Sequence, residues 1–146
     1  MPAYRFKTDG SHLTKVPNSR ANSRPASTGF GWHLFGENGY INRMAVKPII
    51  PSSNNVAEWC AVIDAVEYTL DNLVDVSELS IETDSELVVK QISGEYAVKK
   101  DNLKLLKARY DQLLNQADFP IVVKHIPREE NQIADALSKI ASLLND

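Results

Sequence analysis

Cysteine is nearly absent from this 146-residue sequence, which contains only Cys60. A single cysteine forms neither an internal disulfide nor a cysteine-cluster metal site, so a bound metal requires oxygen ligands. Long apolar runs are also missing: none approaches the roughly 18 residues of a membrane span, and residues 1–8 lack the pattern of a secretory signal. We therefore expect a soluble, cytoplasmic protein with no membrane partner.

Positive charge is absent from residues 48–89, which carry nine acids, whereas residues 1–27 and 90–109 are basic. The net charge of -3 conceals this asymmetry. The basic stretches can contact a polyanion, but each can equally be the solvated surface of a helix or loop. Charge therefore identifies no partner by itself.

Length and composition indicate one packed domain over residues 1–146. Single cores typically span about 100 to 200 residues, and the contents of 43% hydrophobic and 24% charged residues are those of ordinary globular proteins. Residues 11–27 are an exception, because they are rich in Ser, Asn, Pro and Arg and are typical of a long exposed basic loop.

Alternation of apolar and polar residues predicts three strands before the first helix. Residues 4–8 alternate, and Asp9 is expected to end this strand. Residues 28–35 and 39–50 indicate two further strands, which complete an antiparallel meander.

Helices and strands then alternate along the second half of the chain. The expected elements are a helix capped by Asn55, a strand at 79–83, a helix at 85–93 ended by Gly94, a helix around 103–113, a strand at 119–126 and a last helix from Asn131. The last helix is expected to bury Ile133, Leu137, Ile140 and Leu144. Helices between strands imply parallel crossovers, so the predicted fold is α/β, with a mixed sheet covered by helices.

Four acids fall at the tips of these elements. Asp9 and Asp84 end the first and fourth predicted strands, and Glu58 and Asp135 lie in the first turns of two predicted helices. If the two strands are parallel neighbours, their carboxyl ends share one edge of the sheet. Carboxylates gathered there raise one another's pKa unless cations neutralise them. Oxygen ligands favour Mg²⁺ or Mn²⁺, and two such ions support in-line displacement at phosphorus.

Each acid also has an ordinary structural explanation. Asp9 suits a tight turn with the glycine that follows it, and Glu58 has the spacing of a helix capping box. Asp84 can cap the helix after it, and Asp135 is favoured near a helix amino end. The four contexts taken together favour the metal site.

Four short segments also carry a family resemblance: Thr8-Asp9-Gly10-Ser11, Asn54-Asn55-Val56-Ala57-Glu58, Glu82-Thr83-Asp84-Ser85 and Asn131-Gln132-Ile133-Ala134-Asp135-Ala136-Leu137. In this order and spacing, the chain resembles type 1 ribonuclease H over nearly its whole length. The resemblance implies a five-stranded mixed sheet with helices on both faces. It also implies cleavage of the RNA strand of RNA/DNA hybrids by two Mg²⁺ ions, with Mn²⁺ as a substitute, leaving 3′-hydroxyl and 5′-phosphate ends. Its catalytic, metal-binding set corresponds to Asp9, Glu58, Asp84 and Asp135.

The resemblance suggests further roles near these acids. Residues matched to substrate contacts are Gly10, Ser11, Asn54, Asn55, Ser85 and Asn131, although Asn55 and Asn131 can equally be helix caps. Glu86 stands where many relatives have a glutamine that reads the minor groove. Arg128 is favoured over His125 as the residue that assists catalytic turnover, because it lies in the loop before the last acid.

Relatives of this family differ in how they hold the DNA strand. The segment between the middle helices is too short for the basic protrusion of some relatives. Part of it is expected to be replaced by Lys99, Lys100, Lys104 and Lys107, of which Lys99 and Lys100 are the predicted substrate contacts. We therefore expect a monomeric hybrid-specific endoribonuclease. The alternatives are a nucleic-acid-binding module with weak or no catalysis, and another polynucleotide nuclease of the same fold.

Overall fold

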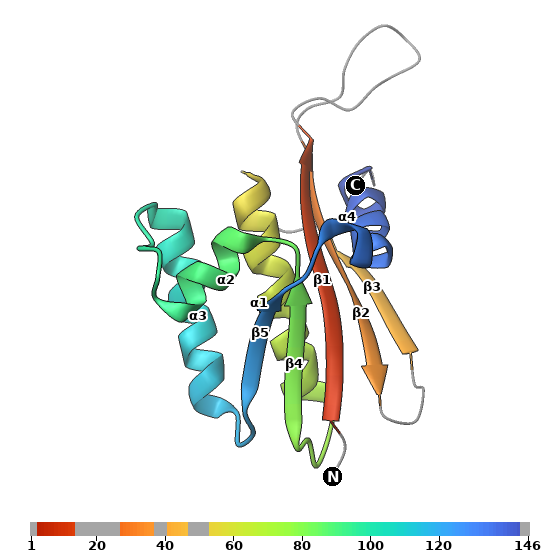
Figure 1. The fold of residues 1–146 in the computed structure, drawn as a ribbon, viewed down its shortest axis with the longest axis vertical. Helices are drawn as coiled ribbons and strands as arrows, with labels where there is room; N and C mark the ends of the chain where they lie inside the picture. The colour runs from red at the N-terminus through yellow and green to blue at the C-terminus, as the bar shows by residue number, and fades with distance from the viewer. Residues whose placement is uncertain (1–2, 14–26, 37–40, 47–52, 144–146) are drawn as a thin grey trace, which may run out of the picture.

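The computed structural model describes residues 3–13, 27–36, 41–46 and 53–143. Its strands form a five-stranded sheet in the order β3-β2-β1-β4-β5 (Figure 1). The strands are β1 (Ala3–Leu13), β2 (Ser27–Gly36), β3 (Ile41–Val46), β4 (Glu78–Thr83) and β5 (Ile121–His125). The β1–β2 and β2–β3 pairs are antiparallel, and the β1–β4 and β4–β5 pairs are parallel. The predicted α/β class, with a meander followed by parallel crossovers, is confirmed.

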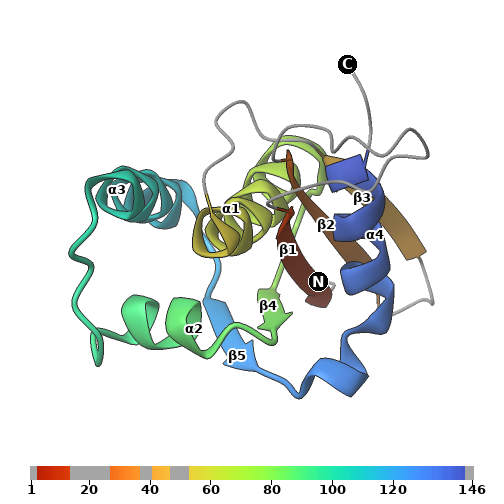
Figure 2. The ribbon, with the colours of Figure 1, turned by 90° about the horizontal axis from the view of Figure 1, so that it is seen from above.

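Helices cover both faces of this sheet. They are α1 (Asn54–Asn72), α2 (Glu86–Ser93), α3 (Asp101–Gln116) and α4 (Gln132–Leu143), with a short 3₁₀ helix η1 (Arg128–Glu130) before α4. Seen from above, α1 and α3 lie on one side of the sheet, and α4 lies on the other side over β1, β2 and β3 (Figure 2). Within the described ranges, no helix has the length and apolar content needed to cross a membrane.

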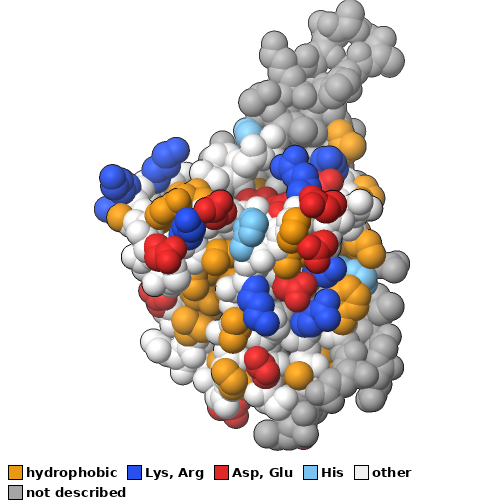
Figure 3. All heavy atoms as spheres, in the orientation of Figure 1, with side chains coloured by type: hydrophobic (Ala, Val, Ile, Leu, Met, Phe, Trp, Pro, Cys, Tyr) orange, Lys and Arg blue, Asp and Glu red, His pale blue; other side chains and the backbone are white. Residues whose placement is uncertain are grey.

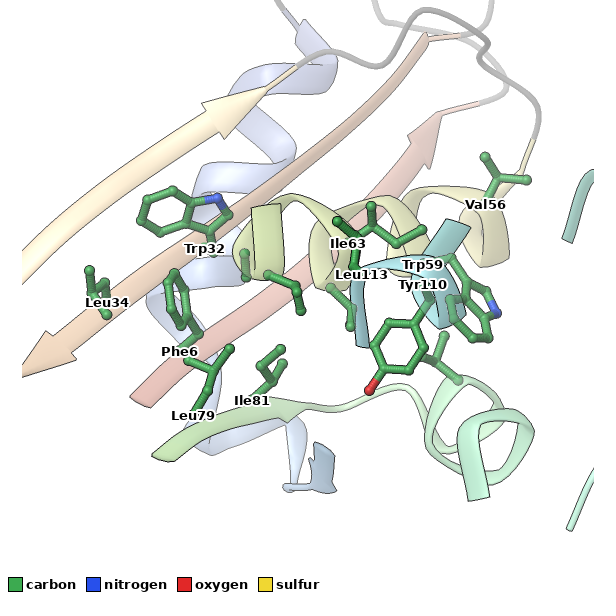
Figure 4. Packing of buried hydrophobic residues seen from close by; sticks show 14 of the residues in the cluster. Phe6, Trp32, Leu34, Val56, Trp59, Ile63, Leu79, Ile81, Tyr110 and Leu113 are labelled. Carbon is green, nitrogen blue, oxygen red and sulfur yellow. The ribbon is translucent and has the colours of Figure 1, made fainter. Parts of the chain in front are cut away.

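The main hydrophobic core lies between the sheet and α1 (Figure 4). Phe6 of β1 meets Trp32 of β2 edge-on, with ring centroids 5.0 Å apart, and both side chains are fully buried. The Trp32 Nε1–H donates to Asp64 of α1 at 2.7 Å, so the buried indole is also hydrogen-bonded. Burial of each large side chain contributes roughly 1.5–3 kcal/mol. This packing fixes the position of α1 along β1.

β1 extends beyond the end that the sequence pattern predicted. The prediction that Asp9 ends the strand is wrong, because β1 continues to Leu13 and Asp9 pairs with Gly31 of β2. Pairing with a long neighbouring strand outweighs the local turn preference of an Asp-Gly dipeptide. Most of the predicted basic loop, residues 14–26, lies outside the described residues.

The first turns of α1 and α2 are set by serines. Ser53 caps α1 by accepting the Val56 N–H at 3.2 Å, so the prediction of Asn55 as the cap is wrong by two residues. Glu58 consequently lies in the second turn of α1, not in the first. Ser85 caps α2, and Gly94 ends that helix in the left-handed conformation, as predicted.

α4 buries small side chains and exposes large ones. Ile133 and Ile140 are 42% and 51% exposed, so the predicted buried face is wrong at these two positions, and Leu144 lies outside the described residues. The buried residues of the helix are Ala134, Ser138, Ala141 and Ser142. A Cβ on Gly29 of β2 would lie 2.3 Å from the Ser142 amide nitrogen. The helix therefore packs too close to β2 to leave space for isoleucine or leucine.

Candidate active site

Three acidic side chains from three different elements meet at one edge of the sheet. Asp9 comes from the middle of β1, Glu58 from α1 and Asp84 from the residue after β4. One carboxylate oxygen from each lies within 4.8 Å of the others. Asp135, in the first turn of α4, lines the same cavity of about 300 Å³. The four acids selected from the sequence are therefore brought together, although Asp9 arrives from mid-strand and not from a strand end.

Glu58 is held in place by the strands that it faces. The Gly10 N–H donates to its Oε1 at 3.0 Å, and the Thr83 hydroxyl donates to its Oε2 at 3.4 Å. A side chain at position 10 has no space, because a Cβ there would lie 2.2 Å from the Ala57 carbonyl carbon. The glycine thus permits α1 to approach β1 closely enough to deliver Glu58 to Asp9.

The start of α4 is tied to β1 from the other face. Asn131 is fully buried, and its Nδ2 donates to the Thr8 carbonyl oxygen at 2.8 Å. The Lys7 Nζ donates to the Glu130 carbonyl oxygen at 2.9 Å. These two bonds fix the chain just before Asp135 against the strand that carries Asp9.

Burial and mutual repulsion make the site unfavourable for negative charge. Burial, followed by the neighbouring Glu58 and Asp84 carboxylates, raises the pKa of Asp9 far above its ordinary value. Burial likewise raises the pKa of Glu58, although its hydrogen bonds partly offset this. Burial also disfavours the charged form of Asp135, but hydrogen bonds from Asp9 and Lys139 and the Lys139 charge outweigh it and lower the pKa of Asp135.

This donor set fits divalent, oxygen-preferring cations. The facing groups are carboxylates, and no cysteine or histidine lies among the described residues that line the cavity. Hard cations such as Mg²⁺ and Mn²⁺ prefer such ligands. A bound cation also relieves the repulsion that burial imposes on Asp9 and Glu58, so the electrostatics and the ligand chemistry agree.

Most of the predicted substrate-binding residues line the same cavity: Gly10, Ser11, Asn54, Asn55 and Ser85. Asn131 does not line it, and its complete burial leaves no surface for a substrate, so it supports the site from behind. Lys99 and Lys100 are exposed and do not line it either. In Figure 3, Lys and Arg side chains gather over the α2–α3 connection, apart from the acids at the centre of this face.

The structure distinguishes the two residues considered for a role in turnover. Arg128 lines the cavity, and its Nε lies 4.0 Å from Asp84 Oδ2 while the side chain is 86% exposed. His125 is exposed at the end of β5 and does not line the cavity. The role of Arg128 in turnover stays a prediction.

Sequence reasoning missed two residues of α4 that contact the acids. The Lys139 Nζ forms an ion pair with Asp135 Oδ2 at 3.1 Å. Its spacing of four residues from Asp135 was the available signal. The Ser138 hydroxyl lies 3.3 Å from Asp9 Oδ2, and only the tertiary fold reveals this contact.

Residues 18–141 match the family described as Reverse transcriptase-like. In sequence, the chain is 34% identical over 123 residues to Ribonuclease HI of Halobacterium salinarum, covering 84% of this chain and 59% of that relative. The chain thus spans about three fifths of the length of that relative.

Solved structures agree with the sequence comparison. The crystal structure of RNase H1 from Halobacterium salinarum superposes with a TM-score of 0.77 at 31% identity, covering 95% of this chain and 96% of that one. LC11-RNase H1 in complex with an RNA/DNA hybrid gives a TM-score of 0.76 at 31% identity, with the same coverage. The chain belongs to the type 1 ribonuclease H family.

Proposed function

We propose that this protein is an endoribonuclease that hydrolyses the RNA strand of RNA/DNA hybrids. The observation that carries the proposal is the convergence of the Asp9, Glu58 and Asp84 carboxylates within 4.8 Å, with Asp135 in the same cavity. Similarity to LC11-RNase H1, whose structure contains an RNA/DNA hybrid, supports the choice of substrate. We further propose that two Mg²⁺ ions serve the reaction and that Mn²⁺ can replace them.

Each acid has a distinct place in this reaction. The carboxylates of Asp9, Glu58 and Asp84 would hold the ions together with Asp135, with Glu58 approaching from the α1 face of the sheet and Asp135 from the α4 face. When bound, divalent ions would activate a water molecule and stabilise the leaving oxygen during displacement at phosphorus, which would give 3′-hydroxyl and 5′-phosphate ends. Arg128, whose Nε lies 4.0 Å from Asp84 Oδ2, would contact the phosphate of the substrate.

The residues around the acids supply substrate contacts without reading sequence. Ser11, Asn54, Asn55 and Ser85 offer neutral hydrogen-bonding groups along the cavity. Such groups suit the 2′-hydroxyls and phosphates that a hybrid presents across its minor groove. Selection of RNA by its 2′-hydroxyl then restricts cleavage to the RNA strand.

A cleavage assay tests the proposal directly. The purified protein is incubated with an end-labelled RNA/DNA hybrid in Mg²⁺, with a chelator arm and with duplex DNA and duplex RNA of the same sequence. We expect RNA-strand cleavage of the hybrid in the metal arm alone. Binding of the hybrid without product identifies a binding module instead, and cleavage of duplex DNA identifies a different polynucleotide nuclease.

A further inference from the structure

A serine on α4 contacts the central acid of the site. The Ser138 hydroxyl lies 3.3 Å from Asp9 Oδ2 and 2.8 Å from the Asp135 carbonyl oxygen, and the residue is fully buried. A hydroxyl carries one hydrogen, so these two acceptors compete for it. The Asp135 carbonyl also accepts the N–H four residues later in α4, as every carbonyl inside a helix does. It therefore depends less on the hydroxyl than the Asp9 carboxylate does.

The other groups facing Asp9 are poor donors. Three carboxyl groups of the described residues act on Asp9, those of Glu58, Asp84 and Asp135. With a divalent cation bound these acids would be ionised, and an ionised carboxylate only accepts hydrogen bonds. Ser138 thus provides the neutral hydroxyl donor that reaches Asp9 in the part of the chain that the structure describes.

Packing alone does not call for a serine at position 138. Ala134 and Ala141 lie on the same buried face of α4, and alanine is both smaller and a stronger helix former. Ser142, one turn later, is equally buried and donates to the Lys139 carbonyl oxygen at 2.8 Å. The two serines share burial and the bond to the preceding turn, and differ in the contact with Asp9.

We propose that Ser138 is a positioning residue that holds the Asp9 carboxylate in its metal-binding orientation. The proposal rests on the proposed function, because it assumes that Asp9 binds a divalent cation. Partners that orient metal ligands from behind the site commonly change metal affinity by about 10- to 100-fold when they are removed. α4 packs closely on β2, where a Cβ on Gly29 would lie 2.3 Å from the Ser142 amide nitrogen.

The test compares Ser138→Ala with Ser142→Ala as the matched control. Mg²⁺ affinity is measured by titration calorimetry on the free protein, and kcat and KM for the hybrid are measured at saturating and limiting Mg²⁺. We expect Ser138→Ala to weaken Mg²⁺ affinity by about tenfold and to lower activity mainly at limiting Mg²⁺. Ser142→Ala should match the wild type in both measurements, and thermal unfolding in chelator should be similar for the two variants.

Two further variants separate the possible outcomes. Ser138→Thr keeps the hydroxyl but adds a buried methyl group, so we expect lower stability with Mg²⁺ affinity close to that of the wild type. Asp9→Asn should lose Mg²⁺ binding, and its failure to do so would overturn the proposed metal site itself. If Asp9→Asn loses binding while Ser138→Ala behaves like Ser142→Ala, the role of Ser138 alone is refuted.

Discussion

The Gly10 amide donates a 3.0 Å hydrogen bond to Glu58 Oε1, which joins the middle of β1 to the second turn of α1 across 48 residues of sequence. The bond exists because position 10 carries no side chain: a Cβ there would lie 2.2 Å from the Ala57 carbonyl carbon. One glycine therefore fixes both the separation of strand and helix and the orientation of Glu58, one of the acids proposed to bind metal.

Replacing this glycine should damage stability and metal binding together. We expect Gly10→Ala to lower the free energy of unfolding by about 3 kcal/mol, the scale of other overpacked core sites. Gly94→Ala is the control, because a Cβ at position 94 meets open space. The left-handed backbone of that residue disfavours alanine by only about 1 kcal/mol. Chemical denaturation and Mg²⁺ titration of both variants check this. Equal effects of the two substitutions would contradict the prediction.

Asp9→Asn should have opposite effects on activity and on stability. Loss of the central ligand should reduce hybrid cleavage by at least about 1,000-fold, corresponding to roughly 4 kcal/mol of transition-state stabilisation. In chelator, the same change removes a buried acid among like charges, so we expect the free energy of unfolding to rise by at least about 1.4 kcal/mol, the equivalent of one pKa unit. Activity assays and denaturation in chelator measure the two effects, and wild-type activity of this variant would falsify the site.

The metal-free protein should become less stable as the pH rises. The unfolded chain releases the Asp9 and Glu58 protons near pH 4, whereas burial raises the pKa of Glu58 to about 7 and that of Asp9 to about 10 in the folded state. The folded state then binds more protons than the unfolded state above about pH 4, so stability falls with increasing pH across this window. Thermal unfolding in chelator from pH 5 to 8 checks the sign. Saturating Mg²⁺ should flatten the decline, and a melting temperature that rises with pH in chelator would contradict the prediction.

Arg128 and His125 should differ in their effect on turnover. Arg128 lines the cavity and lies 4.0 Å from Asp84, while His125 does not line it. We expect Arg128→Ala to reduce kcat/KM by roughly tenfold, the loss of one charge-assisted contact. His125→Ala should leave it within about twofold. Steady-state kinetics on one hybrid compares the two variants, and a larger loss for His125→Ala would reverse the assignment.

The lysines beside α3 should contribute to hybrid binding through charge alone. Each phosphate contact made by Lys99 or Lys100 should steepen the dependence of log affinity on log salt by nearly one unit. Lys107→Ala is the control, because its ammonium is already paired with Asp111 at 2.8 Å. Salt titrations of hybrid binding compare Lys99→Ala, Lys100→Ala and the control. An unchanged salt slope for the first two variants would show that these lysines do not touch the substrate.

Local sequence patterns predicted most of the helices and strands of this fold. Propensity and amphipathicity act between side chains within one or two turns of one another. They account for the periodicity of α1, the end of α2 at Gly94 and the order of strands and helices along the chain. The four acids were found in the same way, because their short neighbouring motifs resemble those of a known family. Helix starts were less certain, since Ser53 and Asn55 are both good capping residues.

Long-range packing decided what those patterns could not. Asp9 lies in mid-strand because β2 continues beside it, and α4 buries alanine and serine because Gly29 lets the helix approach β2 too closely for its isoleucines. The contact of Ser138 with Asp9 joins residues 129 positions apart. The sequence by itself indicated the four acids and the elements that hold them. Only the tertiary structure decided how closely those elements pack, because the distance between two elements depends on the steric fit of segments that are remote in the chain.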